Sequence, residues 1–501
     1  MVGAAIGAFS VFCILPLAYM IAVALSEPGR AALYADLFLD YRQRALLFNT
    51  AILGVGTAVA ATVIGVPLGV ALARLALPFK AGLRIVLAAP ALIPSYIVGL
   101  AWLYFGGPEG LPAALFVLTV LLYPLSMLIA ESAIRGVEPR LEEAASLAAK
   151  PGRVLWRITL PLVVPSVLAA ALIVFVLAVS DFGVPALLRA RVFTTEIFTA
   201  FSALYDFGRA TALAVPLLSL AMLVAVISVR LTGERLVTRR RRLGGGGDLG
   251  AFDRWRGVAA LTIACVVAST LVLPIGVLAI EARGVSSWAG VVRGSGDAIL
   301  NSLTLAAAGA TIVSAVALGL GYVRARTTGA AGLLGDVLFV VLFAVPGTIV
   351  GVALIGIWNR AGPAGAVYAT NGMFLLVYLA RFTPLAALAL AASIRHVPAS
   401  HEEAAAVSGA SWLQTLVHIV VPQMKIGLAA AWVVVFTLAF GELGASVLVS
   451  PPGESTLPIR IYTLIANAPP AQVAALALLQ VAVIFCPLAI LGFSVAARKQ
   501  S

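Results

Sequence analysis

Charged residues are scarce in this chain, and their scarcity excludes most soluble folds. Only 11% of the 501 residues are Asp, Glu, Lys or Arg, whereas 62% are hydrophobic, and the mean hydropathy is +1.09. A soluble chain of this length would form about three domains, each with a charged surface. The composition instead places most of the chain in lipid.

Cysteine and lysine are also few. The three cysteines (Cys13, Cys265 and Cys486) are odd in number and lack a CxxC spacing, which predicts neither a disulfide framework nor a metal site. A phosphate-cradling loop needs G-x-x-x-x-G-K-[ST], and no lysine here follows a glycine. No Ser-His-Asp set, catalytic carboxylate pair or Gly-rich cofactor motif occurs in a long extramembrane segment. We therefore expect no catalytic residues, no bound cofactor and no enzymatic activity in this chain.

Long apolar runs are abundant. A bilayer core of roughly 30 Å takes about 20 mainly apolar residues per helix, and about twelve such runs are present. We predict an all-α integral membrane protein with spans near residues 5–26, 46–74, 82–105, 112–134, 161–181, 208–231, 257–281, 298–326, 332–357, 371–394, 421–441 and 471–495.

The net charge of +12 is informative through its location. With both termini cytoplasmic, most Lys and Arg residues fall on the inside, as the positive-inside rule requires. The run Arg239–Arg242, followed by Gly244–Gly247, fits a basic linker that faces the lipid surface. RNA binding or nuclear targeting is the alternative for this run. We expect a multi-pass protein of the bacterial inner membrane, with the lipid bilayer and no nucleic acid as partners.

An internal repeat divides the chain. Residues 48–74 align with residues 300–326 at an offset of 252, which pairs Asn49 with Asn301 and Arg74 with Arg326. The pairing continues at offsets of 252, 260 and finally 261, through Pro94 and Pro346, Gly99 and Gly351, Pro124 and Pro384, Arg135 and Arg395, Glu143 and Glu403, Pro161 and Pro422, and Asp181 and Glu442.

The repeat predicts the domain organisation. Residues 1–231 form a first permease half, residues 232–256 a cytoplasmic linker and residues 257–501 a second half. Each half has six spans, an even number, so the two enter the membrane with the same orientation. They are therefore parallel repeats, and a path is expected between them.

Two cytoplasmic segments carry the strongest functional signal. They are residues 142–161, EEAASLAAKPGRVLWRITLP, and residues 402–422, EEAAAVSGASWLQTLVHIVVP. Each begins with Glu in a first helical turn and continues with Ala-Ala, a bend and a short amphipathic helix. Such a short helix is not stable alone in water and would gain by lying in a groove of another protein.

These segments resemble the EAA loop of bacterial ABC importer permeases, E-A-A, three residues, G, nine residues, I-x-L-P. The second copy fits with Val421 in place of Leu, whereas the first has Ala149 in place of the glycine and is one residue shorter, so its bend is assigned to Pro151-Gly152. The candidate residues for coupling to an ATPase are Glu143, Ala144, Ala145, Gly152 and Pro161 in the first loop, and Glu403, Ala404, Ala405, Gly409 and Pro422 in the second.

The resemblance implies a mechanism and partners. Each half would have a MetI-like permease core, and each loop would dock on one of two ATP-binding-cassette ATPase subunits, which hold the ATP and Mg. A periplasmic binding protein would deliver the substrate. Closure of the ATPase pair would rotate the halves between inward-open and outward-open states.

Three charged residues in or near spans are candidates for the translocation path. Asp181 and Glu442 stand at equivalent positions near the outer ends of fifth spans, and charges in membranes are costly and therefore suggest function. They could line the path or contact the backbone at a helix end. Arg381 aligns with Leu121 and could pair with an acid, face the path or snorkel to the surface.

Within these permeases, single chains with two fused halves resemble the ferric-iron and thiamine branches. The phrases IPSYIVGLAWLYFGG, SDFGVPALL and PPGESTLPIRIYTLI look more like the ferric-iron branch, which implies ferric iron as the cargo. Thiamine, phosphonate or another small solute is the alternative for the same architecture. An ion-gradient-driven secondary transporter and a membrane scaffold without a path are alternatives from other classes.

Overall fold

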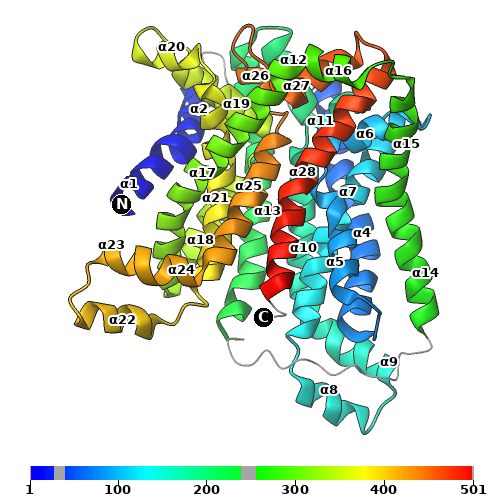
Figure 1. Ribbon diagram of the computed structural model, residues 1–501, viewed down its shortest axis with the longest axis vertical. Helices are drawn as coiled ribbons and strands as arrows, with labels where there is room; N and C mark the ends of the chain where they lie inside the picture. Colours follow the sequence, from blue (N-terminus) through cyan, green and yellow to red (C-terminus); the bar gives the residue numbers. More distant parts are fainter. Residues whose placement is uncertain (1, 27–39, 239–254, 499–501) are drawn as a thin grey trace. The chain divides into compact units, whose positions relative to one another are not determined.

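The computed structural model describes residues 2–26, 40–238 and 255–498, and all regular structure within them is helical (Figure 1). Nine of the described helices are long and apolar enough to cross a membrane, and three bent helix pairs raise the number to twelve. Helices suit lipid because they satisfy their own backbone hydrogen bonds. Each of the twelve predicted spans matches one of these helices or pairs, so the predicted fold class is confirmed. The run Arg239–Arg242 and Gly244–Gly247 lie outside the described residues.

The chain divides into two compact units. One unit consists of Tyr34–Glu196 and Pro216–Arg283, and it contains most of the first repeat. Its helices are α4 (Tyr41–Arg74), α5 (Lys80–Ala88), η2 (Ala89–Leu92), α6 (Ser95–Tyr104), α7 (Leu111–Arg135), α8 (Pro139–Ser146), α9 (Pro151–Val154), η3 (Leu155–Thr159), α10 (Leu160–Ser180), α11 (Gly183–Leu187), α14 (Arg256–Val267), η5 (Ala268–Val272) and α15 (Leu273–Glu281).

The other unit consists of Met1–Leu33, Ile197–Val215 and Gly284–Ser501. The chain passes between the units within α12 (Phe193–Ser202), α13 (Phe207–Thr238) and η6 (Ala282–Gly284). The remaining helices of this unit are α1 (Val2–Phe9), η1 (Ser10–Ile14), α2 (Leu15–Ser26), α16 (Trp288–Gly294), α17 (Gly296–Arg326), α18 (Gly329–Ala344), α19 (Gly347–Trp358), α20 (Pro363–Tyr368), α21 (Gly372–Ile394), α22 (Ala399–Val407), α23 (Trp412–Thr415), η7 (Leu416–Val420), α24 (Val421–Gln423), α25 (Lys425–Phe440), α26 (Ser446–Val449), α27 (Leu457–Ile465) and α28 (Pro470–Arg498).

The units exchange their first spans relative to the sequence repeat. Helices α1 and α2 pack against α17, α19 and α21 of the second repeat, where the thiol of Cys13 donates to the carbonyl of Leu379 at 3.4 Å (Figure 1). Helices α14 and α15, at the start of the second repeat, pack instead against α4, α5 and α6 of the first. The compact units therefore do not follow the boundaries 1–231 and 257–501, which describe the repeat in sequence.

Proline breaks the third predicted span of each repeat. The helix axis turns by 86° between η2 and α6, and by 91° between α18 and α19. Pro94 and Pro346 stand at the two breaks, and the preceding residues, Ile93 and Val345, have ψ angles of 130° and 125°. A residue before proline is pushed out of the helical region, and proline has no N–H to continue the helix. The repeat landmarks Pro94 and Pro346 thus mark bends in the membrane helices.

Glycines bring the central helices of each unit into close contact. A Cβ atom added to Gly69 of α4 would lie 2.7 Å from the carbonyl oxygen of Met127 in α7. The equivalent Gly321 of α17 would place a Cβ 3.0 Å from the carbonyl oxygen of Ala387 in α21. Small residues at such positions let membrane helices pack backbone against backbone. A glycine at the equivalent position therefore allows close packing of the equivalent helix pair in each repeat.

Candidate functional site: the two docking loops

Each docking loop is a pair of short helices joined by a turn. In the first repeat, α8 is followed by a turn over residues 147–150, and then by α9 and the π-helical turn η3. In the second, α22 is followed by a bend at Gly409, which has φ of +83°, and then by α23 and η7. Glycine is favoured at positive φ because it has no Cβ atom. Gly409 thus makes the bend that the sequence predicts.

The predicted bend of the first loop is wrong in position. Pro151 and Gly152 form the first turn of α9, where Pro151 takes the start of a helix without losing a backbone hydrogen bond. The turn precedes them, so Gly152 is a helical residue with open space around it. Since this turn contains Ala149 and no residue with positive φ, it does not need a glycine.

The two loops also join their membrane helices differently. In the first repeat, residues Pro151–Ser180 form one continuous helical segment that passes through Pro161. In the second, the segments Trp412–Gln423 and Lys425–Phe440 meet at an angle of 81°, just after Pro422. The first loop is therefore continuous with α10, whereas a bend separates the second loop from α25.

A buried ion pair holds the first loop on the end of α4. Nη2 of Arg74 lies 2.8 Å from Oε1 of Glu142, and only 2% and 5% of the two side chains are exposed. The same nitrogen donates to the carbonyl of Ile134 at 3.0 Å, and the hydroxyl of Thr159 donates to Glu142 at 2.6 Å. A charge pair in such a place is stable only when further hydrogen bonds satisfy it. This network connects the ends of α4 and α7 with α8 and η3.

The second loop carries the equivalent pair. Arg326, at the end of α17, forms an ion pair with Glu402 of α22 and donates to the carbonyl of Val397 at 3.1 Å. The hydroxyl of Tyr322 donates to Glu402 at 2.6 Å, and its ring lies edge-on to Trp412 at 5.3 Å between centroids. Arg74 and Arg326 occupy equivalent positions in the two repeats, and the structure gives the reason. Each arginine connects a docking loop to a membrane helix.

The outer surface of each loop is apolar and acidic. Leu147 and Val407 occupy equivalent positions, and their side chains are 90% and 91% exposed. The predicted residues Glu143 and Glu403 are exposed beside them, on α8 and α22. Two nearly fully exposed aliphatic side chains at equivalent positions indicate a protein partner for each loop.

The alanines of the predicted motif lie on the first helix of each loop, and its prolines lie where each loop enters the following helix. Ala144 and Ala404 are exposed, Ala145 is half-buried and Ala405 is buried, so the two pairs form part of the α8 and α22 surfaces. Pro161 and Pro422 follow the π-helical turns η3 and η7, which accommodate residues without an N–H.

Two of the three candidate path residues, Asp181 and Glu442, lie at the ends of the fifth spans of their units, and the third, Arg381 of α21, contacts Glu442. Oδ1 of Asp181 accepts from the N–H of Val184 at 2.8 Å, and Oε1 of Glu442 accepts from the N–H of Ala445 at 2.6 Å. The two acids therefore accept hydrogen bonds from backbone N–H groups at the starts of the short helices α11 and α26, which follow the fifth spans. Arg381 forms an ion pair with Glu442, whose side chain is 3% exposed. A place for these residues on a translocation path stays a prediction.

Comparison with known proteins assigns the chain to a family. The family of binding-protein-dependent transport system inner membrane components matches this chain twice, at residues 65–242 and 315–498. The chain belongs to this family. The two matches cover corresponding parts of the repeats, and the paired docking loops are the EAA loops typical of such permeases.

Relatives of this permease include iron transport proteins. The Fe(3+)-transport system permease protein FbpB 2 of Haemophilus influenzae is 24% identical over 446 residues, which are 85% of each chain. The putative ferric transport system permease protein FbpB 1 of the same organism is 25% identical over 68% of this chain and 56% of its own length. The molybdenum transport system permease protein ModB of Mycobacterium tuberculosis is 32% identical over 26% of this chain and 58% of its own.

Sequence reasoning missed the buried members of the loops. It identified Glu143 and Glu403, which face outward, and passed over Glu142 and Glu402, which hold the loops in place. A signal was present, because an arginine occurs at the same repeat position at the end of an apolar helix in both halves. Such an arginine needs an acidic partner, and each loop offers one in its two adjacent glutamates.

Proposed function

We propose that this permease passes ferric iron across the inner membrane, driven by two copies of a separate ATP-binding-cassette ATPase. One ATPase subunit docks on each EAA loop and holds the ATP and Mg, and this chain has no catalytic residue. A periplasmic binding protein delivers the iron to the opposite face, and both termini and both loops are cytoplasmic. The observation that carries the proposal is the pair of equivalent docking loops, each exposed at its outer surface and anchored by an ion pair that is buried in the first loop and partly buried in the second.

The geometry supports a coupling role for the loops. Leu147 and Val407 can enter an apolar groove of the partner, while Glu143 and Glu403 offer a carboxylate beside each. Because Glu142 and Glu402 connect the loops to α4 and α17, a displacement of the docked helix moves the membrane helices with it. ATP-driven closure of the two ATPase subunits would in this way change the access of the path.

The docking proposal is tested by co-purification and ATPase activity. We expect the wild-type permease to co-purify with its ATPase and to stimulate ATP hydrolysis when the loaded binding protein is added. A variant with both Glu143→Gln and Glu403→Gln should lose the stimulation while remaining folded. Unchanged stimulation in this double variant would contradict the role of the loops.

Iron as cargo is supported by the relative named for Fe(3+) transport, which aligns with 85% of the chain. The shorter alignments with a molybdenum permease and with a putative 2-aminoethylphosphonate permease favour an oxyanion or phosphonate as the second candidate. Binding-protein-dependent uptake of radioactive ferric iron, compared with molybdate and 2-aminoethylphosphonate, separates the candidates. Uptake of either anion without iron uptake would overturn the assignment of the cargo.

A further inference from the structure

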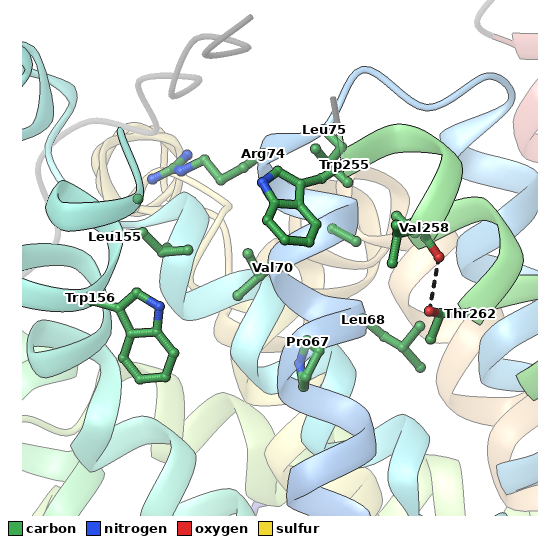
Figure 2. Close-up of a pocket in the computed structure, with 13 residues that line it drawn as sticks. Pro67, Leu68, Val70, Arg74, Leu75, Leu155, Trp156, Trp255, Val258 and Thr262 are labelled. Atoms are coloured by element: carbon green, nitrogen blue, oxygen red, sulfur yellow. Dashed lines mark hydrogen bonds between the residues drawn. The ribbon is translucent and has the colours of Figure 1, made fainter. Parts of the chain in front are cut away.

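An apolar cavity lies beside the docking loop of the first repeat. It has a volume of about 350 Å³ and is formed by α4, the start of the α9–η3 segment and the start of α14, all within one compact unit (Figure 2). Pro67, Leu68, Leu155 and Val258 belong to its walls, and the one charged lining residue is Arg74. The hydroxyl of Thr262 does not offer a donor to a ligand, because it is bonded to the carbonyl of Val258 at 2.9 Å.

The position of the cavity selects a lipid tail as its occupant. Both α4 and α14 belong to candidate membrane spans, and the wall from Pro67 to Arg74 is about 10 Å long at the rise of an α-helix. Trp156 and Trp255 line the cavity on η3 and before α14, and their side chains are 72% and 50% exposed. Tryptophan favours the boundary between hydrocarbon and head groups, so a lipid with its tail in the cavity would have its head group at this level.

The guanidinium of Arg74 at one end of the cavity has a spare donor for an anionic head group. Arg74 is buried, its Nη2 is used by Glu142 and Ile134, and its Nη1 has no hydrogen-bond partner among the described residues. The exposed residues Arg153 and Arg157 lie on the adjoining α9–η3 segment. A guanidinium with a spare buried donor binds a phosphate oxygen well.

The second repeat does not form this cavity in the same way. Gly319 stands at the position equivalent to Pro67, and a Cβ atom added to it would lie 2.8 Å from Cβ of Ala5 in α1. Helix α1 is therefore in direct contact with α17 at the position where the equivalent wall of α4 is open. In the second repeat, α1 packs directly on α17. In the first repeat, a bound molecule would fill the equivalent space between α14 and α4.

We propose that this cavity binds one anionic phospholipid, with an acyl chain between α4 and α14 and the phosphate at Nη1 of Arg74, assisted by Arg153 and Arg157. The lipid bridges η3 of the docking loop and α14, which line opposite parts of the cavity (Figure 2). The proposal goes beyond the transport function and does not depend on it, because lipid binding is measured on the permease itself.

Native mass spectrometry of the full-length permease tests the proposal. The purified protein is supplied with equal amounts of phosphatidylglycerol and phosphatidylcholine, and bound lipid is counted. We expect one phosphatidylglycerol to remain bound to the wild type. Ala259→Trp, which fills the cavity, should abolish this retention, whereas Leu261→Trp, on the exposed face of the same helix, should preserve it. Equal retention of phosphatidylglycerol in both variants would overturn the site.

The head-group contact has its own test. Arg74→Lys keeps a cation for Glu142 but removes the second guanidinium donor, and Arg153→Gln with Arg157→Gln removes the assisting charges. Each variant should reduce the preference for phosphatidylglycerol over phosphatidylcholine by about tenfold, as expected for loss of a charge-assisted hydrogen bond. Wild-type protein that retains both lipids equally would show that the cavity holds bulk lipid only, and would contradict the proposal.

Discussion

Glu142 and Glu143 are neighbours in the sequence but differ in environment. Glu142 is buried against Arg74 and Thr159, whereas Glu143 is exposed on the outer surface of α8. In the second loop, Glu402 is partly buried against Arg326, whereas Glu403 is exposed. The inner acid of each pair positions the loop, and the outer acid is available to the partner.

The adjacent glutamates give a matched pair of variants. Glu142→Gln leaves the buried guanidinium of Arg74 without a counter-charge, and such a loss destabilises a protein by about 3–5 kcal/mol. Glu143→Gln removes an exposed charge and should change stability by no more than about 0.5 kcal/mol. Thermal unfolding of both variants in detergent measures the difference. Equal unfolding temperatures would contradict the anchoring role of Glu142.

The sequence predicted where the loops are but not what holds them. The repeat marks Arg74 and Arg326 by position, yet the partner of Arg74 is 68 residues away in the chain. The pairing depends on how α4 ends beside α8, which no local pattern specifies. For the same reason the repeat paired Asp181 with Glu442 but did not reveal their bonds to the backbone at the starts of α11 and α26, or the ion pair of Glu442 with Arg381.

At the scale of elements, apolar runs predicted the spans well and their bends poorly. Each broken third span is a continuous apolar run, so composition alone cannot distinguish a straight helix from one that turns by 86° or 91°. The breaks at Pro94 and Pro346 follow from the stereochemistry of proline, but Pro67 and Pro124 lie inside unbroken helices. The outcome at each proline depends on tertiary packing.

Packing between α4 and α7 yields a second prediction. Gly69→Ala would place a methyl group 2.7 Å from a backbone carbonyl that cannot rotate away, and overpacking of this kind destabilises by about 1–3 kcal/mol. Gly276→Ala in α15 has open space and should be neutral or stabilise slightly, because alanine favours a helix. Thermal unfolding of the two variants is the measurement. Equal stability would show that the helices are not in close contact.

The unequal bends of the docking loops give a third prediction. Gly409→Ala introduces a Cβ atom at φ of +83°, which strains the backbone by roughly 1–2 kcal/mol. Ala149→Gly is the reverse change at the equivalent position of the first loop. It should cause little strain, because the turn there has no residue with positive φ. We expect ATPase stimulation to fall in Gly409→Ala and to stay near wild type in Ala149→Gly. A larger loss in Ala149→Gly would contradict the asymmetry.

At the scale of the whole molecule, each compact unit needs helices from both sequence halves. Met20 of α2 is fully buried, α2 packs against α19 of the second repeat, and the thiol of Cys13 donates a hydrogen bond to α21. Helix α15 supports α6 in the other unit. The repeat in sequence could not predict this exchange, because a duplicated half carries no information about which copy its first span joins.

The exchange predicts how fragments behave. Residues 1–238 and 255–501, expressed as separate chains, should co-purify and recover transport, since each supplies a first span that the other unit buries. Either fragment alone should aggregate, because it exposes the surface against which that span packs. Size-exclusion chromatography in detergent distinguishes these results. A single fragment that is monodisperse and heat-stable would contradict the interdependence of the halves.

The central claim is that ATP hydrolysis on docked partner subunits drives transport through this chain. Uptake of radioactive ferric iron into proteoliposomes containing the permease, its ATPase and its binding protein tests it most directly. We predict uptake that requires ATP, resists ionophores and is lost when Leu147→Asp and Val407→Asp are introduced together. Uptake that proceeds without ATP and collapses with the ion gradient, or that is unaffected by the two loop substitutions, would contradict the claim.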